Sequence, residues 1–202
     1  MKTLLTVILT LLVAGSAFAQ LPNSMGVFFS DTDLSEANTN ANPTMNVPFD
    51  AWIAILNTEV ITVGGYECGL TAPATLLALA ADGPNGWTNF GGSNWNHLCG
   101  FMVPVPAYQT GDAVLGHLQL MYLSTDAANI VMGPATPSSF NNEGPGIADG
   151  ANPDWLILCP YTSGPDWPTL GEVATLNGAG ITFPESVATQ NQSLTSVKAL
   201  FN

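Results

Sequence analysis

The sequence predicts an all-β protein, an antiparallel β-sandwich followed by a short C-terminal helix. Apolar and polar residues alternate along many short segments, which is the pattern of strands with one buried face. About seven to nine such segments recur roughly every ten residues with Gly, Pro, Asn and Ser between them, which favours a sandwich over alternating strands and helices. Hydrophobic residues make up 47% of the 202-residue chain, enough for one sizeable core.

The N-terminal residues have the pattern of a secretory signal peptide. Lys2 precedes an apolar run over residues 4–14, and a small-x-small cleavage signal ends at Ala19. A transmembrane helix needs about 20 apolar residues, so this run is too short for an anchor. We therefore expect a secreted, extracellular or periplasmic protein that does not insert into the membrane after cleavage. The chain divides into a signal peptide (1–19), a sandwich domain (20–185) and a tail with a short helix (186–202).

The charge of the chain is strongly acidic. Fifteen Asp and Glu residues face two Lys residues and no Arg, which gives a net charge of −13. Nucleic acids and anionic lipids are bound by the Lys and Arg that this chain lacks, so neither is expected as a partner. The acidity is explained either by solubility outside the cell or by the binding of a cation.

The clearest strand patterns lie at residues 49–56 and 66–70. Side chains alternate in both, so we predict two strands that pair antiparallel as a hairpin. The connection between them ends in Gly64 and Gly65, which can adopt the positive φ of a turn or bulge. A hairpin is not stable alone in water, so the rest of the chain must cover it.

The remaining segments are assigned in chain order. Residues 73–81 fit either a strand or a short helix, because a short apolar run suits both. Residues 134–153 are rich in Pro, Gly, Ser and Asn and predict a long surface loop. A helix is predicted over residues 193–201, where apolar residues recur at spacings of three and four after Ser193, a residue that can cap it. Further strands are expected at residues 25–30, 97–105, 114–123, 129–133, 155–159 and 178–184.

The three cysteines allow at most one intramolecular disulfide. Cys68, Cys99 and Cys159 each lie in an apolar, strand-like segment and form no zinc-binding motif. If a bridge exists, we expect it between Cys68 and Cys99, whose strands flank the same apolar segment and loop. The alternative is that the cysteines are buried, inert thiols.

Two loops carry candidate ligand-binding residues. Asp31, Asp33 and Glu36 lie close together in a polar loop and could supply oxygen ligands to calcium, although the loop lacks the glycine and terminal glutamate of a known calcium motif. The alternative is a loop that is simply solvated.

The loop over residues 82–96 carries Trp87, Phe90 and Trp95 among Gly and Asn residues. Flat rings stack on the apolar faces of sugars while Asn side chains supply hydrogen bonds, so the three rings are candidates for a sugar-binding surface. Alternatively, the rings fold back as lids over the core.

Candidate catalytic residues are few. No nucleophile elbow, metalloprotease motif or phosphate-binding loop is present. His97 and His117 could act in acid–base or metal chemistry, but ordinary strand histidines are commoner. Glu59 and Glu67 could be the paired carboxylates of a glycoside hydrolase, but nothing places them across a cleft, and Glu67 on its strand is expected to face solvent. We therefore expect a protein that is not an enzyme.

Part of the sequence resembles a known group of sandwiches. The alternating strand at residues 49–56, the Gly-Gly-Tyr-Glu-Cys-Gly-Leu strand at 64–70 and the Gly-Asp strand that begins at residue 111 resemble the early and middle strands of cohesin-like and related carbohydrate-binding β-sandwiches, which are immunoglobulin-like in fold. The resemblance covers roughly residues 46–133 and implies a sandwich with a surface open to a ligand, but not dockerin recognition. The whole mature chain is also similar to a group of exported bacterial β-sandwich proteins with a Val-Lys-x-Leu-aromatic ending, as at residues 197–201.

Two functions of different class follow from these observations. The first is a secreted or cell-surface, non-catalytic binding module for an extracellular polysaccharide or a partner protein. The second is a structural subunit of a surface filament or layer, in which a strand or an exposed sheet edge pairs with the next copy and so produces self-assembly. Neither needs a cofactor other than the calcium considered above.

Overall fold

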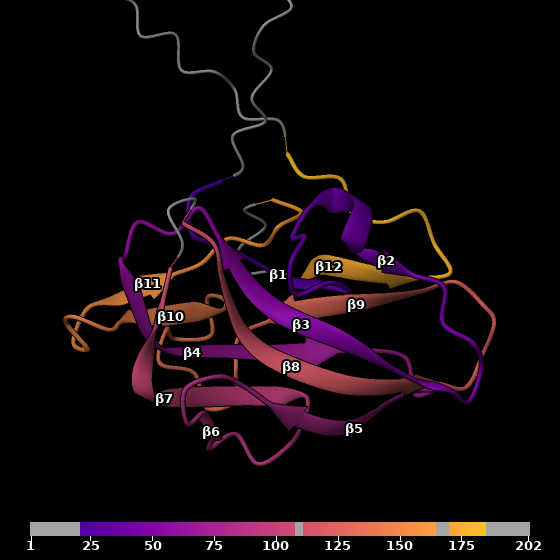
Figure 1. Cartoon of the computed structure of the whole chain (residues 1–202), viewed down its shortest axis with the longest axis horizontal. Helices are drawn as coiled ribbons and strands as arrows, with labels where there is room; N and C mark the ends of the chain where they lie inside the picture. The colour runs from indigo at the N-terminus through magenta and orange to yellow at the C-terminus, as the bar shows by residue number, and fades with distance from the viewer. Residues whose placement is uncertain (1–20, 108–110, 165–169, 185–202) are drawn as a thin grey trace, which may run out of the picture. The chain divides into compact units, whose positions relative to one another are not determined.

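The computed structural model describes residues 21–107, 111–164 and 170–184, which belong to one compact unit. They form two packed β-sheets, so the predicted all-β sandwich is confirmed (Figure 1). The signal peptide predicted at 1–19 and the helix predicted over 193–201 lie outside the described residues. Within the described ranges, no helix is long and apolar enough to span a membrane.

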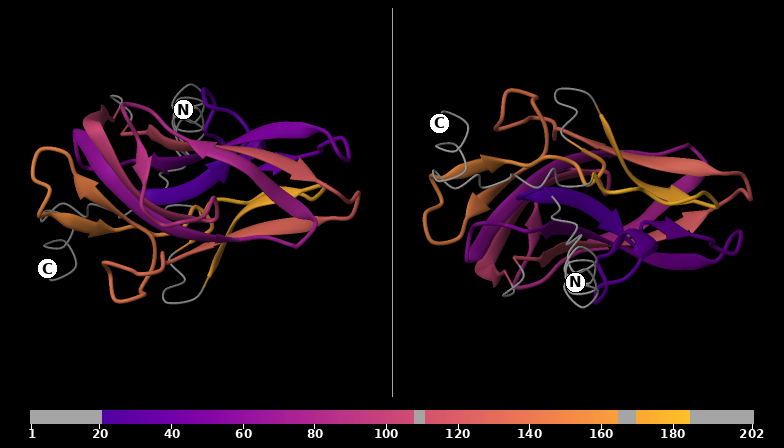
Figure 2. Two further views of the ribbon diagram at one scale, coloured as in Figure 1. Left: turned by 90° about the horizontal axis from the view of Figure 1, so that it is seen from below. Right: turned by 90° about the horizontal axis from the view of Figure 1, so that it is seen from above.

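The sandwich consists of a four-stranded and an eight-stranded sheet, whose layers are seen from below and above in Figure 2. The four-stranded sheet has the order β1-β3-β8-β5, formed by Ser24–Phe28, Pro48–Leu56, Ala113–Tyr122 and Leu76–Asp82. The eight-stranded sheet has the order β11-β10-β4-β9-β12-β2, formed by Leu156–Leu158, Gly146–Asp149, Thr62–Thr71, Ala128–Gly133, Gly171–Leu176 and Asn40–Ala41. β7 (Asn96–Pro106) pairs with β4 and with β6 (Thr88–Asn89) to complete it. All pairs are antiparallel except β12 with β2, and a 3-10 turn, η1, spans Glu36–Asn38.

The predicted hairpin does not form. β3 pairs with β1 and β8, whereas β4 pairs with β7, β9 and β10 in the other sheet. The connection between β3 and β4 begins at Asn57, which has a positive φ of 51°, and carries the chain from one layer to the other. Both strands bury one face in the same core, so the alternation of side chains was correctly assigned but could not distinguish a hairpin from a sheet-to-sheet corner.

Two other assignments differ from the sequence prediction. Residues 178–184 form no strand; Ile181 is instead held through the Oγ1 atom of Thr39, which accepts its amide at 2.7 Å. The last strand is β12, which was not predicted and pairs with β9. The ambiguous segment 73–81 contains all but the last residue of the edge strand β5, and the predicted loop over 134–153 contains the short strand β10.

The core lies between the two sheets. Leu115, Leu118 and Leu120 of β8 meet Tyr66 of β4 and Met132 of β9, all of them buried. Gly116 has no side chain where the Tyr66 hydroxyl approaches, and a Cβ atom there would collide with it. The phenol therefore reaches deep into the core because β8 carries a glycine at that position.

The outer face of the four-stranded sheet is only partly covered. At one end, Phe28, Ala54 and Leu56 are buried beneath Leu34 and Phe183, with the rings of Phe28 and Phe183 in an edge-to-face contact at 6.3 Å. The other end of the same face has no such cover. There the sheet presents a cluster of polar and aromatic side chains, described next.

Candidate ligand-binding site

A row of side chains crosses the outer face of the four-stranded sheet. Pairing places Phe28 of β1 opposite Trp52 of β3, Trp52 opposite His117 of β8, and His117 opposite Asp82 of β5. Asp50, two residues before Trp52 on β3, points to the same face. Three strands, β3, β8 and β5, therefore bring an indole, an imidazole and two carboxylates together on one surface.

His117 lies between the two carboxylates. Its Nδ1 atom is 3.0 Å from Oδ1 of Asp82, and its Nε2 atom is 3.0 Å from Oδ1 of Asp50. Burial lowers the pKa of His117, but the hydrogen bonds and negative charges of Asp50 and Asp82 outweigh this effect and raise it above its ordinary value. The protonated imidazolium can donate from both nitrogens, so this form fits the geometry.

Trp52 forms the apolar part of the site. Its ring is tilted by 36° against the His117 ring, with centroids 5.5 Å apart. The indole lines a hollow of about 570 Å³ that also contains Asp82, Asn85 and His117. A second hollow of about 370 Å³ lies along Trp52, Asp50 and Phe49. The indole therefore separates two depressions, each bordered by polar groups.

The exposed charges leave hydrogen-bonding capacity for a ligand. The Asp50 and Asp82 side chains are 50% and 70% exposed, and each uses one oxygen toward His117. A carboxylate accepts about four hydrogen bonds, so both can accept more from a ligand's hydroxyl or amine groups. With one imidazolium and two carboxylates, the cluster favours neutral or cationic ligands.

The three loop aromatics predicted as a stacking surface do not share one. Trp87 and Trp95 are half-buried and pack against the core, and Nε1 of Trp87 donates to the Tyr66 hydroxyl at 3.3 Å. Only Phe90 is well exposed, at 76%, and it faces the outer side of the eight-stranded sheet. The structure thus favours the alternative of rings folded onto the core for the two tryptophans.

The other predicted histidine, His97, is buried in the core. Its Nδ1 atom accepts from the Tyr66 hydroxyl at 3.0 Å, and its Nε2 atom donates to the carbonyl of Asn94 at 3.0 Å. Burial lowers the pKa of His97 to about 4, although the Asn94 hydrogen bond acts in the opposite direction. His97 is therefore a neutral, structural histidine in this arrangement.

Cys68 and Cys99 are buried, free thiols, so the predicted bridge is not formed in the structure. The pairing of β4 with β7 places Cys68 opposite His97 and Cys99 opposite Tyr66. The two cysteines are therefore diagonal neighbours, whose typical separation of about 7 to 8 Å is too large for a disulfide. Burial raises the pKa of the Cys68 and Cys159 thiols well above their usual value and that of Cys99 to about 12, which keeps all three protonated.

The acidic loop residues are not gathered into a metal centre. Glu36 accepts the Phe183 amide at 2.6 Å, and Asp33 accepts the Ser35 amide at 3.2 Å, while Asp31 is exposed. In the part of the chain that the structure describes, no three His, Cys, Asp or Glu side chains are arranged to hold a metal ion. Calcium binding by these residues stays a prediction.

The two candidate glycosidase carboxylates lie in different places. Glu59 is exposed in the connection between β3 and β4 and does not line the hollow that contains Glu67. Glu67 was expected to face solvent but is only 6% exposed. It points to the outer face of its sheet as predicted by alternation, but the segment at Ser138 and Ser139 folds over it and donates hydrogen bonds to it.

Sequence reasoning did not assign Trp52, Asp50 and Asp82 to a site. The available signal was local: Asp50 and Trp52 occupy alternate positions of one strand, so they share a face. Their partners His117 and Asp82 are distant in the sequence and reach them only through the register of β3, β8 and β5.

No protein-family model and no curated protein matches the chain. Among solved structures, a type II cohesin domain from the cellulosome of Acetivibrio cellulolyticus aligns with a TM-score of 0.48 and 13% identity, over 80% of this chain and 98% of that chain. A cohesin module from a family 33 glycoside hydrolase of Clostridium perfringens aligns with a TM-score of 0.47 and 10% identity, over 77% and 96%. These matches confirm the weak cohesin-like resemblance predicted from the strand motifs. At such low similarity they carry no information about the site.

Proposed function

We propose that this protein is a secreted, non-catalytic module that binds an extracellular polysaccharide through the Trp52 site. The proposal rests on the cross-strand row in which Trp52, His117 and Asp82 lie side by side on an open sheet face. An indole supplies a flat apolar surface for a pyranose ring, and the carboxylates accept hydrogen bonds from its hydroxyl groups. The two hollows beside Trp52 offer room for sugar units on either side of the stacked one.

The charge of the site narrows the class of polysaccharide. Asp50 and Asp82 carry two negative charges against one on the protonated His117, and the whole chain has a net charge of −13. Uronic acid and sulfated polymers would be repelled. Neutral glucans, or polymers with amino groups such as chitosan, fit the site better.

A binding assay against a panel of polysaccharides tests this function. The mature protein should be retained by a neutral or amino-bearing polymer and not by alginate, with a dissociation constant in the micromolar to millimolar range typical of a small exposed site. Trp52→Ala should weaken binding at least about tenfold, because the stacking surface is lost. Asp82→Ala should weaken it less, and since this side chain is 70% exposed its removal should leave the fold intact.

Trp155→Ala provides the matched control. It removes another indole, which is 55% exposed and lines neither of the two hollows beside Trp52. Retained binding by Trp155→Ala with loss in Trp52→Ala supports the assignment. Equal binding by the parent and a correctly folded Trp52→Ala protein contradicts it.

A further inference from the structure

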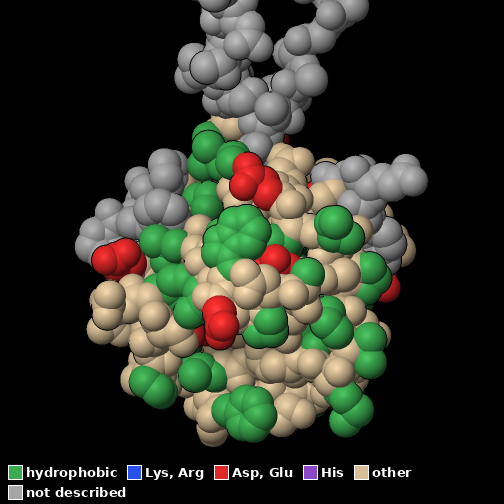
Figure 3. All heavy atoms as spheres, turned by 90° about the vertical axis from the view of Figure 1, so that its left-hand side faces the viewer, with side chains coloured by type: hydrophobic (Ala, Val, Ile, Leu, Met, Phe, Trp, Pro, Cys, Tyr) green, Lys and Arg blue, Asp and Glu red, His purple; other side chains and the backbone are tan. Residues whose placement is uncertain are grey.

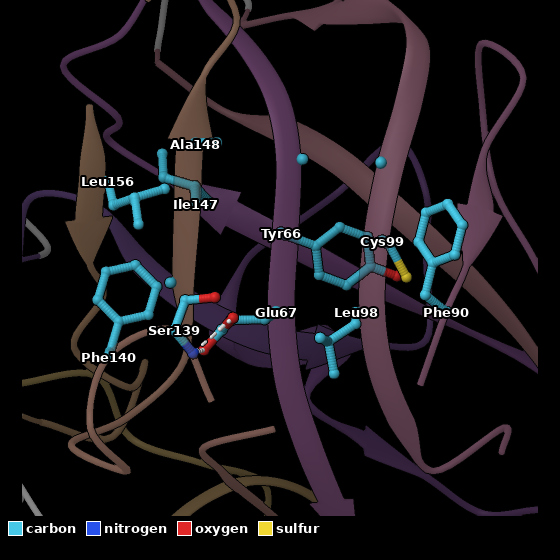
Figure 4. A pocket seen from close by; sticks show the side chains of 13 residues that line it. Tyr66, Glu67, Phe90, Leu98, Cys99, Ser139, Phe140, Ile147, Ala148 and Leu156 are labelled. Carbon is cyan, nitrogen blue, oxygen red and sulfur yellow. Dashed lines mark hydrogen bonds between the residues drawn. The ribbon is translucent and has the colours of Figure 1, made fainter. Parts of the chain in front are cut away.

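The outer face of the eight-stranded sheet carries a further hollow, of about 450 Å³, which is largely apolar. Figure 4 shows Phe140 and Leu156 on one side of β4 and Phe90 on the other. We call this hollow the β4 groove. Gly65 and Gly100 lie at its floor; a Cβ atom at Gly100 would meet nothing closer than 3.9 Å, whereas one at Gly65 would collide with the carbonyl oxygen of Cys99.

The walls of the β4 groove expose apolar surface. Phe90 is 76% exposed and Leu156 is 46% exposed, and the neighbouring Met102 of β7 is 85% exposed. Large apolar side chains that share one exposed face mark an interaction surface more often than isolated ones do. Hydrophobic side chains also lie beside acidic ones on the face shown in Figure 3, where no Lys or Arg is visible.

The Glu67 side chain lines the groove, where it is 6% exposed beside Ser138 and Ser139, and no Lys or Arg of the described residues pairs with it. Oε1 of Glu67 accepts from Oγ of Ser138 and from the Ser139 amide, both at 2.9 Å, and Oε2 accepts from the same amide at 3.1 Å. Oε2 thus shares one donor with Oε1 and retains acceptor capacity. Neither Lys nor Arg occurs in residues 21–107, 111–164 or 170–184, so no cationic side chain of the described part can compensate this charge except a protonated histidine.

One segment of the chain has the matching chemistry. Residues 193–201, outside the described structure, contain Lys198, which is the only Lys or Arg of the sequence besides Lys2. Around it lie apolar side chains of the size that the groove walls would bury: Leu194, Val197, Leu200 and Phe201. A lone cation flanked by apolar residues complements a lone carboxylate flanked by apolar residues.

We propose that residues 193–201 of a second copy of this chain occupy the β4 groove, with Lys198 directed at Glu67 and the apolar side chains against Phe90, Phe140 and Leu156. The path of the chain favours a second copy. Phe183, close to the end of the described residues, packs on Phe28 at the outer face of the four-stranded sheet, whereas the groove opens on the outer face of the other sheet.

An intramolecular connection would have to run around the edge of the sandwich. Lys198 lies fourteen positions beyond Pro184, a length of about 50 Å only when fully extended. The helix predicted from residue 193 onward would shorten this reach, because a helix rises only about 1.5 Å per residue. A tail that binds the next copy is free of this limit. Because donor and acceptor surfaces differ, the contact is head-to-tail and builds rings or open chains of copies.

Sedimentation velocity of the mature protein over a concentration series tests self-association. We expect species larger than a monomer whose fraction grows with protein concentration. Phe90→Ser and Lys198→Gln should each need a concentration at least about tenfold higher to reach the same degree of association. Ile61→Ser is the control for the apolar change, since Ile61 is 84% exposed and does not line the groove. Gln192→Glu is the control for charge, since it changes the net charge by the same amount as Lys198→Gln. Both controls should associate like the parent.

A photo-crosslinker in place of Phe201 identifies the acceptor. Crosslinks between two chains that map to peptides around Phe90, Phe140 or Leu156, and that disappear in Phe90→Ser, support the proposal. It is overturned by a monomer at all concentrations, which would assign the groove to another partner, by crosslinks within one chain only, or by crosslinks to other surfaces. Trp52→Ala should associate like the parent. Self-association through the β4 groove and polysaccharide binding through Trp52 are therefore tested independently of each other.

Discussion

The two histidines show how strand alternation gives one residue type two opposite roles. His97 of β7 points into the core, where burial lowers its pKa to about 4 and Tyr66 and Asn94 bond the neutral ring. His117 of β8 points outward, where Asp50 and Asp82 raise its pKa. The first imidazole is part of a closed polar network, whereas the second leaves its partners exposed and able to bind more.

Polar groups contribute to stability at His97 and are available for binding at His117. Each hydrogen-bonding atom of the His97 ring has a protein partner, so its loss would leave buried groups unsatisfied. The His117 cluster lies in contact with solvent, where ion pairs contribute little to folding. Because the His117 cluster contributes little to folding stability and lies on an open sheet face, we infer that it is available for ligand binding.

The largest expected effect is a difference in stability between His97→Ala and His117→Ala. His97→Ala should lower the free energy of unfolding by about 3 kcal/mol, because it leaves a cavity and removes the partner of the Tyr66 hydroxyl. His117→Ala should change it by at most about 1 kcal/mol. Urea unfolding of both variants measures the difference. Equal decreases in the free energy of unfolding would contradict the assignment of His97 to a structural role and of His117 to an exposed site.

The pH dependence of stability should have opposite signs at the two residues. The folded pKa of His97 is lowered, so its contribution is complete above its ordinary pKa of 6.5 and is lost as the pH falls toward about 4, by about 3 kcal/mol in total. The folded pKa of His117 is raised, so its small contribution is complete below 6.5 and is lost as the pH rises through the folded value.

Unfolding free energies measured between pH 4 and 8 test this sign. Subtracting the unfolding free energies of His97→Ala from those of the parent at each pH isolates the contribution of His97 from that of the carboxylates, which titrate in both proteins. A difference that does not shrink between pH 6.5 and 4 would mean that His97 is already accessible to protons in the folded state.

The smallest expected effect concerns the carboxylates around His117. Asp50→Asn and Asp82→Asn should each lower the pKa of His117, since each removes one negative charge bonded to a ring nitrogen at 3.0 Å. Proton NMR titration of the imidazole measures the shift, and Glu59→Gln is a control with the same chemical change away from the cluster. An unchanged pKa in both aspartate variants would show that the ion pairs do not persist in solution.

The sequence predicted the layers better than the connections between them. β1, β7, β8 and β9 follow from alternating or apolar segments whose pattern is local. The β3–β4 connection was assigned as a hairpin because alternation reports which face of a strand is buried, not which strand lies beside it. β12 was missed because the short segment Gly171–Leu176 lies between glycines and gives a weak pattern.

The candidate site was less predictable because it depends on register. Trp52 and His117 are cross-strand neighbours because of the register in which β3 pairs with β8 from Pro48 to Ile53, and this register cannot be read from either strand alone. The composition of their loop favoured exposed rings for Trp87 and Trp95, but both rings pack against the core, where burial of their apolar surface is favourable. Glu67 was correctly placed on the outer face, but the distant segment that covers it could not be anticipated.

The placement of Trp52, His117 and Asp82 on three hydrogen-bonded strands has a kinetic consequence. No loop must close or order for a ligand to meet all three side chains, so binding includes no slow conformational step. A shallow site of this kind releases its ligand quickly as well. On a polymer with many equivalent units, a released module meets the neighbouring unit at once, so the protein would remain on the strand while it exchanges between positions along it.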